Sequence, residues 1–260
     1  MTGIARYAIA ATVAAAFTTG MCFLLHETRE QRSLIACNAL SVNFMDSLRF
    51  VSEQDIREYI AASYGDYNGQ RLDSVGLARI EEILESKSAV MNTEAWLSDD
   101  GTLHVDITQR APALRFQNGE KGFYVDDRGY IFPLHPSYTA PVPVVNGSIP
   151  VRMEEGYKGE AGSVEERQWI QGMLGLNGYI KGSKLWKDRI SGIDVRDNGD
   201  ILLTINGRDE IFIFGDSGST AEKFSKIGKY FDYILPDKGD GYYKTVNVKY
   251  NKQIVCRKDM

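Results

Sequence analysis

The stretch QRAPALRFQNGEKGFYVDDRGYIF, residues 109–132, divides the sequence into two different folding patterns. Pro112 lacks a backbone hydrogen-bond donor and holds Ala111 extended, so it predicts a break after the segment that ends at Gln109. Beyond the break, short apolar runs alternate with turn residues, and Asp126-Asp127-Arg128-Gly129 has the composition of a tight turn. These runs predict strands at Leu114–Phe116, Phe123–Val125 and Tyr130–Leu134.

The residues before this break predict a small layered domain over residues 37–109. Ser52 precedes apolar residues at helical spacing and has the chemistry of a helix N-cap. A second helix, opening near Asp73 or Ser74, carries one apolar stripe. The stripes are Ile56, Tyr59 and Ile60 in the first helix and Leu77, Ile80, Ile83 and Leu84 in the second, and strands are expected at Leu40–Asn43, Val90–Leu97 and Leu103–Thr108. The order is therefore β-α-α-β-β, in which two helices cover one face of a three-stranded sheet, and the fold class is α+β.

The residues after the break, 110–260, predict a mostly β domain with two helices. Five of the seven prolines fall between residues 133 and 150, which indicates an extended passage without regular helix. One helix is expected at Ser163–Ile180, with Val164, Trp169, Ile170 and Leu174 as core candidates, and a last helix carries Phe224, Ile227, Phe231 and Ile234. The remaining strands are expected at Ile190–Val195, Ile201–Ile205, Glu210–Phe214, Tyr242–Tyr250 and Ile254–Cys256.

The N-terminus carries the signal of a membrane anchor. Residues 7–25 contain no charged side chain, and as a helix they would rise roughly 28 Å, close to the thickness of a bilayer core. A cleaved signal peptide is the alternative, because Ala14-Ala15-Ala16 offers a cleavage site, but the apolar run continues nine residues past it. We therefore expect an uncleaved helix between a cytoplasmic tail, residues 1–6, and a charged juxtamembrane segment, residues 26–36. The large region that follows is then exported.

Composition excludes several classes of function. The formal net charge is −5 and no basic run exceeds two residues, which argues against nucleic-acid binding. The three histidines and three cysteines lie too far apart in sequence for a zinc or haem motif. Because Cys22 lies in the predicted span, Cys37 and Cys256 are the only exported thiols, and a disulfide between them is left open.

No catalytic constellation stands out. Asp126 and Asp127 are adjacent and suit a turn, while His104 and His135 suit packed or solvated positions better than catalysis. Gly215-Asp216-Ser217-Gly218 follows a strand and precedes the Thr220 region, so we interpret it as a helix-capping loop rather than a hydrolase fragment. Asn146-Gly147-Ser148 matches a glycosylation sequon, for which a turn is the simpler account. The sequence predicts a protein that is not an enzyme and has no cofactor, metal or small-molecule substrate.

These segments together resemble the bacterial cell-division family FtsQ/DivIB, whose first exported module is a POTRA domain followed by a β domain. The motifs that carry the resemblance are Arg110 and Pro112 at the junction, the hairpin from Phe123 to Phe132, and Val142–Gly147. One departure is Gln109, which stands where many members have Glu. The resemblance implies a non-enzymatic scaffold in the inner membrane, at the division septum. It would bind FtsB/DivIC-like and FtsL-like bitopic division proteins and regulate septal peptidoglycan synthesis. A membrane-anchored periplasmic ligand-binding or envelope-sensing module is the alternative.

The candidate partner site lies near the C-terminus. In the expected strand Tyr242–Tyr250, alternation puts Val246, Val248 and Tyr250 on one face and Thr245, Asn247 and Lys249 on the other. We expect this strand to lie near a sheet edge, where Lys249 and Lys252 act as gatekeepers against self-pairing. The resemblance implies that the edge accepts a strand from an FtsB-like partner. The expected partner-binding residues are Tyr243, Val246, Val248, Lys249, Tyr250 and Lys252.

Overall fold

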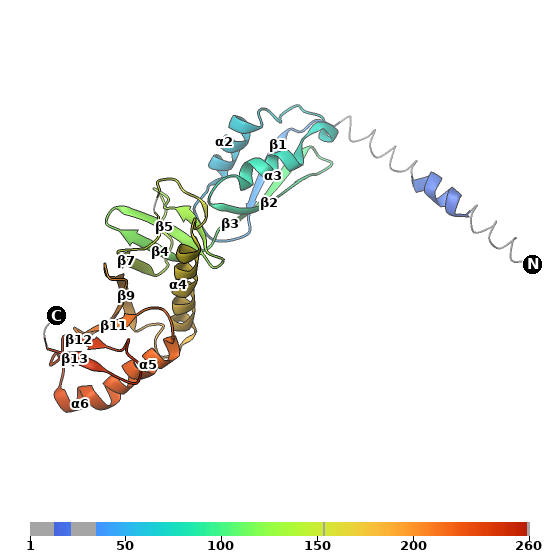
Figure 1. Cartoon of the computed structure of the whole chain (residues 1–260). Coiled ribbons are helices and arrows are strands. Elements are labelled where there is room, and N and C mark those ends of the chain that lie inside the picture. Colours follow the sequence, from blue (N-terminus) through green and yellow to red (C-terminus); the bar gives the residue numbers. More distant parts are fainter. Residues whose placement is uncertain (1–12, 22–34, 153, 259–260) are drawn as a thin grey trace, which may run out of the picture. The chain divides into compact units, whose positions relative to one another are not determined.

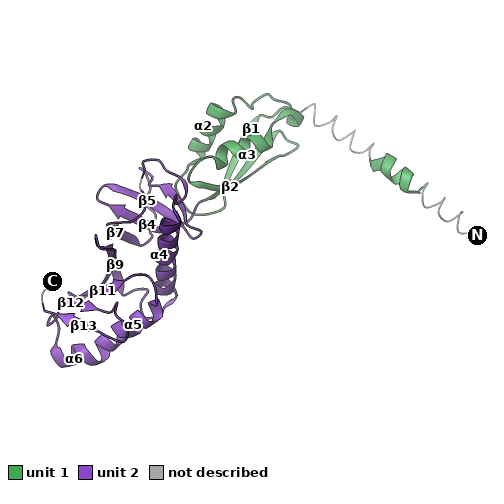
Figure 2. Ribbon diagram, viewed as in Figure 1, with its two compact units in different colours: residues 1–109 green, residues 110–260 purple. Residues whose placement is uncertain are grey.

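The computed structural model describes residues 13–21, 35–152 and 154–258, and the chain forms two compact units, residues 1–109 and 110–260 (Figure 2). Residues 13–21 are helical. The rest of the predicted span 7–25, the tail 1–6 and most of the juxtamembrane segment lie outside the described residues. No helix among the described residues is long and apolar enough to span a bilayer.

Unit 1 confirms the predicted β-α-α-β-β order. Its elements are β1 (Ala39–Phe44), α2 (Glu53–Ser63), the 3-10 turn η1 (Leu72–Ser74), α3 (Leu77–Glu85), β2 (Val90–Leu97) and β3 (Thr102–Gln109). The sheet order is β1-β3-β2, with β1 parallel and β2 antiparallel to the central β3. The helices α2 and α3 cover one face of this sheet (Figure 1), where the inward residues of β3, Leu103, Val105 and Ile107, are fully buried.

Local sequence signals explain how the helices of unit 1 begin. Ser52 caps α2 in a capping box, because its hydroxyl accepts from the backbone N–H of Asp55 and the Asp55 carboxylate accepts from the backbone N–H of Ser52. The second helix begins at Leu77 rather than near Asp73 or Ser74. Residues 72–74 form only the 3-10 turn, and two residues, the extended Val75 and Gly76, separate this turn from α3. The predicted apolar stripe is confirmed for Ile80, Ile83 and Leu84, which are buried, whereas Leu77 is only half-buried.

Unit 2 is built on one mixed sheet of ten strands, in the order β13-β12-β11-β10-β9-β7-β4-β5-β6-β8. The strands are β4 (Pro112–Asn118), β5 (Lys121–Asp126), β6 (Tyr130–Pro133), β7 (Val144–Gly147), β8 (Gly159–Glu160), β9 (Ile190–Val195), β10 (Ile201–Ile205), β11 (Ile211–Gly215), β12 (Thr245–Asn247) and β13 (Val255–Arg257). The helical elements are α4 (Val164–Gly182), α5 (Thr220–Lys229), the π-helical stretch η2 (Tyr230–Ile234) and α6 (Leu235–Lys238). The expectation of a mostly β domain with two principal helices is confirmed.

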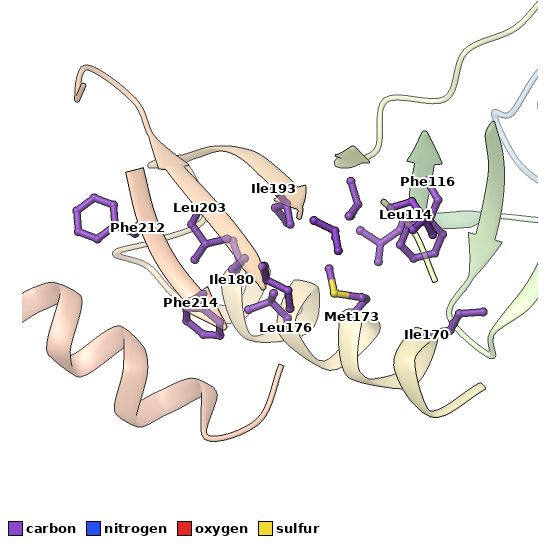
Figure 3. Close-up of a cluster of buried hydrophobic side chains, with 14 of the residues drawn as sticks. Leu114, Phe116, Ile170, Met173, Leu176, Ile180, Ile193, Leu203, Phe212 and Phe214 are labelled. Atoms are coloured by element: carbon purple, nitrogen blue, oxygen red, sulfur yellow. The ribbon is translucent and has the colours of Figure 1, made fainter. Parts of the chain in front are cut away.

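The core of unit 2 lies between the sheet and the helices α4 and α5. Figure 3 shows Ile170, Met173, Leu176 and Ile180 on the inner side of α4, facing strand residues that include Leu114, Ile193 and Leu203. The helix begins where it was expected, and Ser163 caps it in a capping box with Glu166. Val164 was expected in the core but is 53% exposed, because it stands at the first helical position, ahead of the buried stripe.

Glycines along α4 have unequal environments. A Cβ at Gly172 would collide with the Ser217 hydroxyl, so this glycine lets the helix approach the loop before α5. Gly175 faces open space. The helix forms despite these glycines because its apolar face is buried, which outweighs a propensity cost of about 1 kcal/mol for each glycine.

Candidate partner-binding site

The structure separates the expected partner-binding residues into buried and accessible groups. Val246 and Val248 are fully buried in the core of unit 2, and Tyr243 is partly buried against it. Tyr250 is 49% exposed and Lys252 is exposed. Only the exposed members can touch a partner without rearrangement of the core.

The expected strand Tyr242–Tyr250 is shorter than predicted and does not lie at the edge of the sheet. Its regular part is β12, three residues long, which pairs with β11 on one side and β13 on the other. The edge belongs to β13, which is antiparallel to β12 and uses one side for that pairing. The strand thus lies near the edge, as expected, but is not the edge strand itself, because alternation identifies the buried face of a strand and does not identify its neighbours.

The segment after β12 is fixed by one further backbone bond to β11 and by polar side-chain contacts. The Lys226 ammonium donates to the backbone oxygen of Tyr250 at 2.7 Å, and Val248 donates its N–H to the Ile213 carbonyl at 3.0 Å. The Lys249 ammonium lies 2.8 Å from the Asp200 carboxylate, and this hydrogen bond raises the pKa of Lys249. Tyr250 is therefore held in one backbone position while its ring stays accessible.

Residues at the edge itself were not among the predicted ones. Arg257 in β13 and the adjacent Lys258 are exposed, and the Lys258 ammonium lies 4.3 Å from the centre of the Tyr242 ring. Residues 242–258 contain five basic and no acidic side chains. This charge run is visible in the sequence, but its place at the edge depends on the pairing of β12 with β13.

The junction residues Arg110 and Pro112 lie at the start of unit 2. The Arg110 guanidinium bonds the Asp126 carboxylate at 2.8 Å and lies 3.8 Å from the centre of the Tyr130 ring. Asp126 also accepts from the backbone N–H groups of Arg128 and Tyr130, so it closes the predicted turn. Pro112 opens β4 at the first position of the strand, where its missing donor is tolerated.

Gln109, on the other side of the junction, organises the end of unit 1. Its amide nitrogen donates to the Asp46 carboxylate and the Leu48 carbonyl, and its amide oxygen accepts from the N–H groups of Phe50 and Val51. A glutamate could make the two accepted bonds but could not donate the other two. The buried ion pair at this junction is thus made by Arg110 with Asp126 and does not involve residue 109.

Two protein-family models match the sequence. The model described as FtsQ/DivIB, C-terminal related, matches residues 111–257, which is more than half of the chain. The chain belongs to this family. A POTRA-like domain model matches residues 35–108. No curated protein matched the chain. The match covers nearly all of unit 2, and the resemblance drawn from the sequence is confirmed as a relation to FtsQ/DivIB.

The Gly215–Gly218 loop is held by structural contacts in this FtsQ/DivIB-related chain. Asp216 bonds the Lys223 ammonium at 2.7 Å, which lowers the pKa of Asp216, and it accepts the N–H of Gly218. This confirms a loop that leads into α5, although the N-cap position falls on Ser219. Within the described ranges, no group of three His, Cys, Asp or Glu side chains could hold a metal ion. Cys37 and Cys256 are both free thiols.

Proposed function

We propose that this protein is a non-enzymatic, membrane-anchored scaffold of the bacterial division complex. In this proposal, unit 2 binds FtsB/DivIC-like and FtsL-like bitopic division proteins, and the complex regulates septal peptidoglycan synthesis. Residues 7–25 anchor the chain in the inner membrane with the N-terminus in the cytoplasm, and the two units work in the periplasm at the septum. The relation to FtsQ/DivIB supports the class of partner.

The free edge at β13 is the observation that carries the proposal. A strand at the edge of a sheet presents backbone donors and acceptors that another chain can pair with. Within the described residues, β13 has a strand on one side only. The opposite edge of the same sheet, β8, is two residues long and offers little to pair with.

An edge in unit 1 is less suited to strand addition. On β2, the backbone N–H groups of Thr93 and Ala95 donate to the carboxylates of Glu85 and Glu81 on α3, at 3.0 and 2.8 Å. These donors are then occupied before any partner arrives. Strand addition is therefore favoured at β13 of unit 2 over β2 of unit 1.

The charge of the C-terminal segment gives the partner's chemistry. Five basic and no acidic side chains lie in residues 242–258, so an acidic partner strand is favoured electrostatically. Main-chain hydrogen bonds would supply affinity, while exposed side chains such as Tyr250, Lys252 and Arg257 would select the partner.

The test is the affinity of the full-length chain for its FtsB/DivIC homologue. Tyr250→Ala and Arg257→Glu are each expected to weaken binding, the first by roughly thirtyfold, which corresponds to about 2 kcal/mol at an interface tyrosine. Tyr233→Ala is the matched control, because Tyr233 is 74% exposed and lies on η2. Each variant must first unfold cooperatively at the parent's temperature. If folded Tyr250→Ala and Arg257→Glu both bind like the control, the partner does not use this edge.

A further inference from the structure

The net charge of the chain is concentrated on the POTRA-like unit. Residues 35–109 contain five basic and 13 acidic side chains, a formal charge of −8, whereas the whole chain carries −5. A surface of this charge attracts cationic partners and repels anionic ones. The position of the unpaired carboxylates then indicates where such a partner would bind.

The face of the unit 1 sheet that α2 and α3 leave open collects polar side chains and one tryptophan. The register places Ser41, His104 and Trp96 in one row across the sheet, and Asn43, Asp106 and Glu94 in the next. We call these six residues the Trp96 face. It contains two carboxylates and no lysine or arginine.

Trp96 is exposed and yet held in one orientation. Its side chain stacks on His104 with ring centres 3.8 Å apart and an interplanar angle of 8°, and its indole N–H donates to Asp106 at 3.3 Å. The other oxygen of Asp106 accepts from the Asn43 amide at 3.2 Å. Trp96 remains 46% exposed, although stacking covers one side of its ring. A ring fixed in this way loses little conformational entropy when a partner binds.

Charge pairing at the Trp96 face differs from that at some other carboxylates of unit 1. Among the described residues, neither Glu94 nor Asp106 forms an ion pair. Three other exposed carboxylates of the unit do form ion pairs, Glu53 with Arg57, Asp73 with Arg71 and Glu82 with Arg79. Two unneutralised carboxylates beside an exposed indole combine charge attraction with a ring that favours cations over its face.

We propose that the Trp96 face binds a lysine- or arginine-bearing segment of a partner protein. The cationic head lies over the free side of the Trp96 ring, and Glu94 and Asp106 accept its hydrogen bonds. This surface is distinct from the C-terminal edge of unit 2. The inference therefore does not depend on the strand-addition site, and the two can be tested separately.

A labelled hexa-arginine peptide serves as the probe, with fluorescence anisotropy on the full-length chain as the measurement. Trp96→Leu is expected to weaken binding about fivefold, because it removes the aromatic face and keeps an apolar side chain. Glu94→Gln removes one charge at the face and is expected to weaken binding about threefold. Glu58→Gln removes one charge from an exposed position on α2 and is expected to change affinity less than twofold.

The outcomes separate this site from general attraction to an acidic unit. Loss of affinity in Trp96→Leu and Glu94→Gln but not in Glu58→Gln, at an ionic strength that screens distant charges, supports the proposal. Equal effects of Glu94→Gln and Glu58→Gln, with none for Trp96→Leu, overturn it. Binding of an N-acetylglucosamine oligomer through Trp96, without binding of the peptide, would also overturn it. Tyr250→Ala is expected to leave peptide binding unchanged, so failure here and failure of the edge site are distinguishable.

Discussion

The buried ion pair at the start of unit 2 provides the sharpest test of the fold. Arg110 and Asp126 have side chains that are 13% and 4% exposed, and Asp126 also accepts two backbone N–H groups. Asp126→Ala would leave a buried guanidinium without its carboxylate and the turn without its acceptor. Removing one partner of a buried pair costs about 3–5 kcal/mol, whereas a pair in solvent contributes about 1 kcal/mol or less.

Urea unfolding of the full-length chain would measure this cost. A Trp96→Phe background leaves Trp169 and Trp186, both in unit 2, as the only tryptophans, so fluorescence then follows unit 2. With a slope of about 2 kcal/mol/M, Asp126→Ala should lower the urea midpoint by about 1.5–2.5 M. Asp188→Ala is the matched control, because the Asp188 carboxylate is exposed and its ion pair with Lys187 is long, at 3.8 Å.

The double variant separates the ion pair from the turn. Arg110→Met with Asp126→Asn removes both charges and keeps an amide acceptor for the backbone, so it should be less destabilised than the sum of the single variants. A midpoint for Asp126→Ala within about 0.5 M of the Asp188→Ala value would refute the importance of this pair, since that difference is only about 1 kcal/mol.

Three further predictions follow from particular contacts. Gly175→Ala should stabilise unit 2 by up to about 1 kcal/mol, whereas Gly172→Ala should not stabilise it. Thermal unfolding measures both changes, and equal unfolding temperatures of the two variants would contradict the packing of α4. Burial and the nearby Glu210 raise the pKa of Tyr230, so stability should be complete below about pH 10 and fall as the pH rises toward the raised value; a Tyr230→Phe variant with an equal alkaline loss would refute this. Burial also raises the pKa of Cys256, so the Cys256 thiol should react with a thiol reagent more slowly than the thiol of a model peptide does. Equal reaction rates at one pH would show that the fold does not protect the Cys256 thiol.

Unit 1 could be predicted from its sequence because its signals are local. Ser52 marks the start of a helix, and the strand expected at Val90–Leu97 has the bounds of the observed strand. The start of α3 could not be placed, because the 3-10 turn and the helix share the same acidic and apolar composition. Local propensity does not decide between such turns when tertiary packing can stabilise either.

Unit 2 shows where long-range pairing limits prediction. The hairpin of β5 and β6 was predictable because its turn residues are adjacent in sequence, and the Arg110 contact then joins residues 16 positions apart. The buried Glu210 was assigned to a strand, yet it lies just before β11 and accepts the Tyr230 hydroxyl at 3.0 Å. Nothing local in the sequence indicates this partner.

The candidate site illustrates the same limit and shows what it implies for binding. Alternation correctly identified Val246 and Val248 as apolar on one face, but their complete burial makes them part of the core rather than of a contact surface. Tyr250 does not share the buried face, because the backbone turns after Val248. The Lys226 ammonium donates a hydrogen bond to the Tyr250 carbonyl in this turn. A partner strand would therefore meet β13 through its backbone and meet Tyr250 through its ring, two features that come from different segments of the chain. Loss of the Lys226 bond should then weaken partner selection through Tyr250 while the free edge of β13 remains.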